Sequence, residues 1–97
     1  MKHFIVDIIF IAPFEQIEPI VPEHRNFLQT GYDKGLLLAS GPKVPRSGGI
    51  VIARAESRQV IKDYFANDPY RTNNVAEYTF TEFNPVKHSD VLNDWII

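Results

Sequence analysis

The feature that most constrains the fold is an N-terminal segment, residues 3–12, that is apolar on both faces of a predicted strand. It is rich in Ile, Val and Phe, and the run from Ile8 to Ile11 has no polar side chain. Apolar and polar side chains alternate in a strand with one solvated face, whereas a near-continuous apolar run is typical of a strand covered on both faces. We therefore expect this strand to lie in a sheet that is buried on both sides.

The rest of the chain predicts two helices and three further strands. Apolar side chains recur at helical spacing over about residues 22–34 and 58–67, and short strand-like segments lie at 36–40, 50–55 and 75–83. The two middle strands should form an antiparallel hairpin with a long loop. The order β-α-β-β-α-β predicts an α+β, ferredoxin-like fold, in which a four-stranded antiparallel sheet carries both helices on one face.

Each predicted helix has an apolar stripe that should face the sheet. Pro22 suits the first turn of the first helix, and Gly35 lies just beyond its end. Ser57 is a suitable N-cap for the second helix, which Pro69 should end at Asp68. The inward stripes are His24, Phe27, Leu28, Gly31 and Tyr32 in the first helix, and Val60, Ile61, Tyr64 and Phe65 in the second.

One face of this sheet has no helix left to cover it. Residues 1–87 form the predicted domain, and residues 88–97 form a tail in which the stretch 90–97 is a candidate short helix. The tail can cover part of the bare face with Val91, Leu92, Trp95 and Ile96. A second copy of the sheet can cover all of it, so we expect a homodimer with sheets face to face and an enclosed cavity.

Composition and charge exclude several classes of protein. A chain of 97 residues suits one domain, and a formal net charge of −2 without any run of three basic residues disfavours nucleic-acid binding. The longest apolar stretch, Ile8 to Phe14, is too short to span a bilayer and contains Pro13, so we expect no membrane partner and a cytoplasmic location.

The absence of cysteine excludes disulfides, thiol catalysis and a Cys-built zinc site. Three histidines without ligand spacing predict no metal, and Gly48-Gly49 lacks the context of a phosphate loop, so we expect no cofactor.

His24 and Asp68 are the residues that carry candidate chemistry. A lone histidine on an apolar helix stripe is often a packed core residue bonded to one acceptor, but its ordinary pKa of about 6.5 also suits a general acid/base near neutral pH. Asn67-Asp68-Pro69 is ordinary helix-stopping chemistry, and a carboxylate at a helix C-terminus faces the negative end of the dipole. If Asp68 accepts a hydrogen bond from His24, it would fix the tautomer of the ring and stabilise the imidazolium.

A second group of residues is a candidate for substrate contacts. Ser40, Gly41 and Pro42 close the second predicted strand, either as a simple turn or as the wall of a pocket near the helix ends. Ser40 lacks the elbow pattern of a nucleophile, so substrate hydrogen bonding is its expected role. Three arginines, Arg25, Arg46 and Arg71, could bind an anionic substrate or could be solvated surface residues.

Several of these residues stand in an order that resembles the YciI-like (YCII-related) domain family over about residues 1–87. The matching elements are Pro22-x-His24, Gly35-x-Leu37, Ser40-Gly41-Pro42, Gly49 before an apolar strand, and Asn67-Asp68-Pro69-Tyr70 followed by a Tyr-bearing last strand. The resemblance implies a dimeric α+β barrel with an active-site pair at His24 and Asp68, and Tyr70 joins the expected substrate contacts. Asn73-Asn74 departs from the family, in which a glycine often precedes the last strand.

We therefore expect a small cytoplasmic enzyme that performs general acid/base chemistry, of a lyase or isomerase type, on a small organic substrate. Some relatives act as a lyase-like dehydrochlorinase in the degradation of aromatic compounds, and the wider class includes isomerases and cofactor-free oxygenases. The alternative is a non-catalytic ligand-binding or accessory dimer in which the His–Asp pair is structural. A cofactor-free oxygenase is a third interpretation that no residue of this sequence marks.

Overall fold

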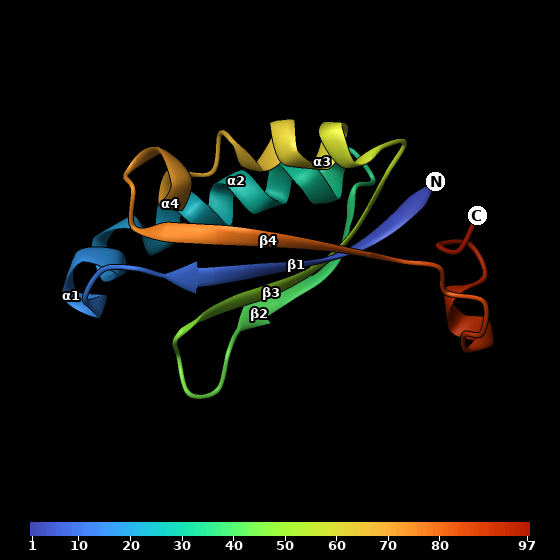
Figure 1. Cartoon of the computed structure of the whole chain (residues 1–97), viewed down its shortest axis with the longest axis horizontal. Helices are drawn as coiled ribbons and strands as arrows, with labels where there is room; N and C mark the ends of the chain where they lie inside the picture. The colour runs from blue at the N-terminus through green and yellow to red at the C-terminus, as the bar shows by residue number, and fades with distance from the viewer.

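The computed structural model describes residues 1–97 and contains one four-stranded antiparallel sheet with helices on one of its faces (Figure 1). The strands are β1 (Lys2–Phe10), β2 (Leu37–Pro42), β3 (Gly48–Ala55) and β4 (Ala76–Phe83). They lie in the order β2-β3-β1-β4, so the N-terminal strand β1 pairs with a strand on each side. The predicted α+β, ferredoxin-like fold is confirmed.

The helices differ from the predicted pair in number and in their ends. They are α1 (Phe14–Ile17), the 3-10 turn η1 (Glu18–Ile20), α2 (Val21–Asp33), α3 (Arg58–Phe65), α4 (Pro69–Thr72) and the 3-10 turn η2 (Asp90–Leu92). The short helices α1 and α4 and the turn η1 were not predicted, because segments of three or four residues are too short to show a period. No helix of the structure is both long enough and apolar enough to cross a membrane.

Both long helices begin and end as their local residues dictate. Pro22 lies in the first turn of α2, where its missing N–H costs no hydrogen bond. Gly35 follows α2 with a positive φ of 73°, a conformation that glycine adopts without strain. The Ser57 side chain accepts a hydrogen bond from the Val60 N–H, which caps α3 as predicted.

The core lies between the helices and one face of the sheet. Alternate residues of β1 and β3 point into it, including Phe4, Val6, Ile8, Val51, Ala53 and Ala55. The helices contribute Leu28, Ile61 and Phe65, and each of these is buried. One prediction about α3 is wrong. Val60, which was expected to face the core, is 43% exposed in the first turn of that helix.

The opposite face of the sheet carries no α-helix, and the C-terminal tail lies at one end of the sheet (Figure 1). Trp95 lies against two residues of this face, with its ring 4.2 Å from the Arg54 guanidinium and 6.3 Å from the His3 ring. His3, which the sequence offers only as the start of a strand, is therefore buried, and burial lowers the pKa of its imidazole. Val91, one of the tail residues expected to cover this face, remains 84% exposed and does not pack against it.

Candidate active site

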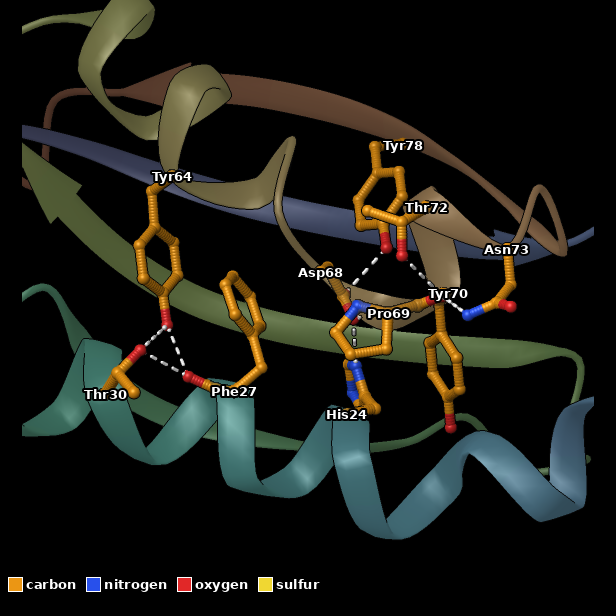
Figure 2. Close-up of polar contacts among 10 residues, drawn as sticks. All are labelled: His24, Phe27, Thr30, Tyr64, Asp68, Pro69, Tyr70, Thr72, Asn73 and Tyr78. Carbon is orange, nitrogen blue, oxygen red and sulfur yellow. Dashed lines mark hydrogen bonds and ion pairs between the residues drawn. The ribbon is translucent and has the colours of Figure 1, made fainter.

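The imidazole of His24 projects from α2 toward the carboxylate of Asp68, although the two residues are 44 positions apart (Figure 2). The distance from His24 Nδ1 to Asp68 Oδ1 is 2.7 Å. His24 lies on the sheet-facing side of α2, while Asp68 lies in the short link between α3 and α4. Asp68 is fully buried and His24 is 8% exposed, so this hydrogen bond is shielded from competing water.

The position of Asp68 corrects one expectation from the sequence. The helix α3 ends at Phe65, and Asp68 has an extended backbone and forms the N-cap of α4. Its Oδ1 also accepts a hydrogen bond from the Tyr70 backbone N–H at 3.1 Å, and Pro69 occupies the first turn. The carboxylate therefore faces the N–H end of a short helix, where a negative charge is favoured, and not the C-terminal end of a long one.

A third donor, Tyr78 on β4, completes the surroundings of the carboxylate. Its hydroxyl donates to Asp68 Oδ2 at 2.7 Å. Burial, followed by the nearby charge of Asp68, raises the pKa of the Tyr78 phenol far above its ordinary range, so this group stays protonated. Sequence reasoning did not select Tyr78, although its alternation with Ala76 and Phe80 on β4 places it on the face toward the helices.

These contacts determine which nitrogen of His24 carries the proton. Both oxygens of Asp68 accept hydrogen bonds from other groups, Oδ1 from the Tyr70 backbone N–H and Oδ2 from the Tyr78 hydroxyl. Because both oxygens already accept a hydrogen bond, the matching arrangement has Nδ1 of His24 donate to Oδ1, and we assign the proton to Nδ1. The other nitrogen, Nε2, then holds the lone pair. Nε2 makes no hydrogen bond within the chain, and it is accessible to solvent.

Tyr70 lies flat against the His24 ring. The two ring centroids are 3.9 Å apart and the planes differ by 12°. Tyr70 also forms a T-shaped contact with Phe10 of β1, at a centroid distance of 5.4 Å and an interplanar angle of 88°. The Tyr70 hydroxyl points away from Asp68 (Figure 2), and burial raises the pKa of this phenol. The imidazole is thus held both by a hydrogen bond at its edge and by a stacked ring on its face.

A cavity of about 240 Å³ opens onto this pair of rings. Most of the predicted site residues line it, namely His24, Arg25, Ser40, Gly41, Pro42, Arg46 and Tyr70. Asp68 lies behind His24 and does not reach the cavity, and Arg71 lines a different one. The Ser40 hydroxyl is hydrogen-bonded to the Tyr32 hydroxyl at 2.7 Å, which holds it at the exposed end of β2.

Glycine shapes the cavity wall where β3 begins. A Cβ atom built on Gly48 would lie 1.8 Å from the backbone oxygen of Ile8, so only glycine allows β3 to lie this close to β1. Elsewhere, no three His, Cys, Asp or Glu side chains lie close enough together to hold a metal ion.

The segment that departs from the expected family pattern keeps the backbone shape of a glycine turn. Asn74, directly before Val75 and β4, has a positive φ of 56°. Asparagine tolerates this left-handed conformation better than most other non-glycine residues. The loop after α4 therefore reaches the same kind of turn with a different residue.

The comparison with known proteins agrees with this fold. A family model described as YCII-related domain matches residues 3–84. The chain belongs to the YCII-related domain family. No curated protein matches the sequence.

A solved structure is similar to almost the whole chain. It is the 5-chloro-2-hydroxyhydroquinone dehydrochlorinase TftG from Burkholderia phenoliruptrix AC1100, in complex with 2,5-dihydroxybenzoquinone. The similarity has a TM-score of 0.73 and 17% sequence identity, and it covers 92% of this chain and 97% of that chain. At this level of identity the similarity shows a shared fold.

Proposed function

We propose that this chain is a small enzyme that uses His24 as a general acid/base on a small organic substrate, with Asp68 as the residue that positions the ring. The observation that carries the proposal is the 2.7 Å bond from His24 Nδ1 to Asp68, which leaves Nε2 as an accessible lone pair at a cavity. A base must lie within hydrogen-bond reach of the proton that it removes, and only Nε2 of this pair faces a space that a substrate can enter.

The proposed chemistry is proton transfer within a lyase-type or isomerase-type reaction. Nε2 takes a proton from carbon or oxygen of the substrate, and the buried carboxylate of Asp68 stabilises the imidazolium that forms. In an isomerisation the same proton returns to another atom of the substrate. In an elimination the electron pair of the broken C–H bond forms a double bond, and the leaving group departs with its own bonding electrons. Neither course needs a further reactant.

The similar solved structure supports the lyase type. Its name describes a dehydrochlorinase, which is an enzyme that removes a proton and a chloride ion, and its ligand is a dihydroxybenzoquinone. The same fold thus supports this class of reaction in another protein. The cavity of 240 Å³ is smaller than the range of about 300–1,000 Å³ that is usual for drug-sized ligands, so we propose a substrate of metabolite size.

A homodimer is part of this proposal. Ile9 is 36% exposed on the helix-free face, where Ile5, Ile50 and Ile52 are only partly buried, and the tail covers just one end. An apolar sheet face of this kind is stabilised by a second copy of the same sheet. Size-exclusion chromatography with light scattering should give twice the chain mass, and a monomer at micromolar concentration would contradict the arrangement.

The alternative is a non-catalytic binding module in which the pair is structural. One observation favours it, since Asp68 caps α4 and satisfies three donors, which gives it a structural role in any case. The two hypotheses differ in what His24 should do. A structural histidine contributes to stability and to the shape of the cavity, whereas a general base also moves protons.

Hydrogen–deuterium exchange separates the two hypotheses even while the substrate is unidentified. A panel of cyclic ketones, enols and hydroxyquinones is incubated with the protein in D₂O, and loss of carbon-bound protons is followed by NMR. The wild-type protein should accelerate exchange in at least one compound, and His24→Gln should reduce that rate by about 10²- to 10⁴-fold. His88→Gln is the matched control, because His88 is an exposed histidine of the tail. Equal exchange by His24→Gln and wild type would rule out a base at this position.

A further inference from the structure

We propose that the substrate of this cavity is a small cyclic organic anion, with its oxyanion group bound by Arg46 and Arg25. The inference rests on the proposed function in that it places the substrate in the cavity of His24, and it adds the chemical class. The class in question is a planar ring that carries a carboxylate, phenolate or enolate oxygen.

The first support is the charge of the cavity. Two arginines and one histidine are among the 14 residues that line it, and none of the 14 is an aspartate or a glutamate. The carboxylate of Asp68 is buried behind His24 and already accepts three hydrogen bonds. A concave site lined by charges of one sign concentrates ligands of the opposite sign.

The second support is that neither arginine has a carboxylate partner. The four ion pairs of the structure join Lys2 or Arg58 to Glu82, Lys43 to Asp7, and His24 to Asp68. Arg25 and Arg46 take part in none of them. Surface arginines often extend freely into water, but these two border the same cavity from α2 and from the loop between β2 and β3. Their charges are therefore available to a ligand.

The third support is the position of Arg46. Its guanidinium lies 4.8 Å from the centroid of the Phe14 ring, a contact that orients the planar group. The positive charge also lies close enough to the Tyr70 hydroxyl to oppose the rise that burial causes in the pKa of that phenol. A guanidinium held in this way offers two parallel N–H groups to a carboxylate.

The shape of the cavity favours a ring. Tyr70 and His24 form a stacked pair beside it, and Phe10 and Val21 add apolar walls. A flat apolar body with one anionic end would place its ring along these walls and its oxygens at the guanidinium groups. The proton to be removed then lies on the part of the ring nearest to His24 Nε2.

Binding of simple aromatic probes tests the inference. Benzoate, 4-nitrophenolate and the neutral isostere benzamide are titrated into the full-length protein by isothermal calorimetry or by ligand-observed NMR. Benzoate or 4-nitrophenolate should bind at least tenfold more tightly than benzamide, and the preferred anion identifies carboxylate or phenolate as the group recognised. Affinity for the anion should fall as NaCl is raised, because the guanidinium groups border open solvent.

Two substitutions test whether Arg46 and Arg25 bind the anion. Arg46→Gln should weaken binding of the anion by tenfold or more, and Arg25→Gln should also weaken it, while benzamide binding stays the same. Arg71→Gln is the matched control, since Arg71 lines another cavity and should leave affinity unchanged. A benzamide affinity equal to that of both anions, or anion binding that survives both arginine substitutions, would overturn the inference.

The same titration keeps this inference separate from the proposed function. His24→Gln should retain binding of the anion while it loses proton exchange. If anions bind through the arginines and no variant affects exchange, the proposed acid/base function fails and the anion site stands. If exchange depends on His24 and anions show no preference, the anion site fails and the acid/base function stands.

Discussion

The phenol ring of Tyr70 stacks on the imidazole of His24 with 3.9 Å between centroids, while the Tyr70 backbone N–H donates to the Asp68 carboxylate. One residue therefore holds both members of the pair. This relationship gives a physical reason for the sequence Asp68-Pro69-Tyr70. The aspartate caps a short helix, the proline begins it, and the tyrosine places its ring over the histidine.

Two substitutions of Tyr70 should distinguish the contribution of its ring to stability from the contribution of its hydroxyl. Tyr70→Phe keeps the stack and should change the free energy of unfolding by less than about 1 kcal/mol, because the hydroxyl does not contact Asp68. Tyr70→Leu removes the aromatic contact and should destabilise the protein by about 2 kcal/mol, of which stacking supplies about 0.5–1.5 kcal/mol. Urea denaturation of both variants measures the difference. Equal stability of the two variants would show that the stack contributes nothing.

Asp68→Asn should destabilise the protein and change the tautomer of His24. The amide has one acceptor oxygen in place of two, so at least one of the donors from His24, Tyr70 and Tyr78 loses its partner, at a cost of about 1–3 kcal/mol. Nitrogen-15 NMR should show a single Nδ1–H tautomer in the wild type and a mixture in the variant. Asp63→Asn is the control, because Asp63 is an exposed acid on α3 whose side chain accepts a hydrogen bond only from Gln59. An unchanged His24 spectrum in Asp68→Asn would contradict the assigned tautomer.

Stability should fall at alkaline pH because buried tyrosines must ionise when the chain unfolds. Burial raises the pKa of Tyr64, Tyr70 and Tyr78 above the ordinary value of about 10. The folded protein then keeps protons that the unfolded chain releases, so this stability is fully present below pH 10 and is lost above it. One such group contributes a slope of at most about 1.4 kcal/mol per pH unit.

Tyr78→Phe isolates one of these groups. At pH 8 the variant should be less stable by about 1–3 kcal/mol, because Asp68 Oδ2 loses its donor. The gap between the variant and the wild type should narrow as pH rises above 10, since phenylalanine does not titrate. Denaturation curves at pH 8, 10 and 11 measure the gap. A gap that is constant with pH would show that Tyr78 ionises as easily in the folded protein as in the unfolded chain.

Gly31 of α2 should tolerate no larger side chain. A Cβ atom at this position would lie 2.5 Å from the Tyr64 hydroxyl oxygen and 2.7 Å from Leu37 Cδ1. Gly31→Ala should destabilise the protein by about 1–3 kcal/mol through overpacking, although alanine is the better helix former by about 1 kcal/mol. Gly41→Ala is the matched control, because a Cβ atom there meets nothing within 4 Å. A more stable Gly31→Ala protein would show that α2 shifts to make room.

Much of the fold could be predicted because the strands and long helices follow from the spacing of apolar side chains along the sequence. The apolar run at residues 3–12 predicts the strand β1, and the stripe from His24 to Tyr32 predicts the inner face of α2. The short helices escaped prediction because three or four residues show no period. The sequence also failed to predict the exposure of Val60, because helical spacing shows which residues share a stripe but not how deeply each one is buried.

The candidate site was also predictable only in part, because some of its residues can be chosen from the sequence and others depend on contacts between distant segments. Residue chemistry alone marks His24 and Asp68, and the resemblance to the YCII-related family joins them. The role of Tyr78 depends on the pairing of β4 with β1, and that of Trp95 on the path of the tail across His3 and Arg54. The sequence predicts that Trp95 covers part of the bare sheet face, but it does not identify Arg54 and His3 as its partners, nor Tyr78 as a partner of Asp68.

The sequence by itself determined the elements, their order and the residue types available for chemistry, because side-chain period and turn residues act over a few positions. Only the tertiary structure decided that Asp68 begins a helix, that it accepts three hydrogen bonds, and that Nε2 of His24 is left free at a cavity bordered by two arginines. These are contacts between segments far apart in the chain, and their distances are set by how the helices pack on the sheet.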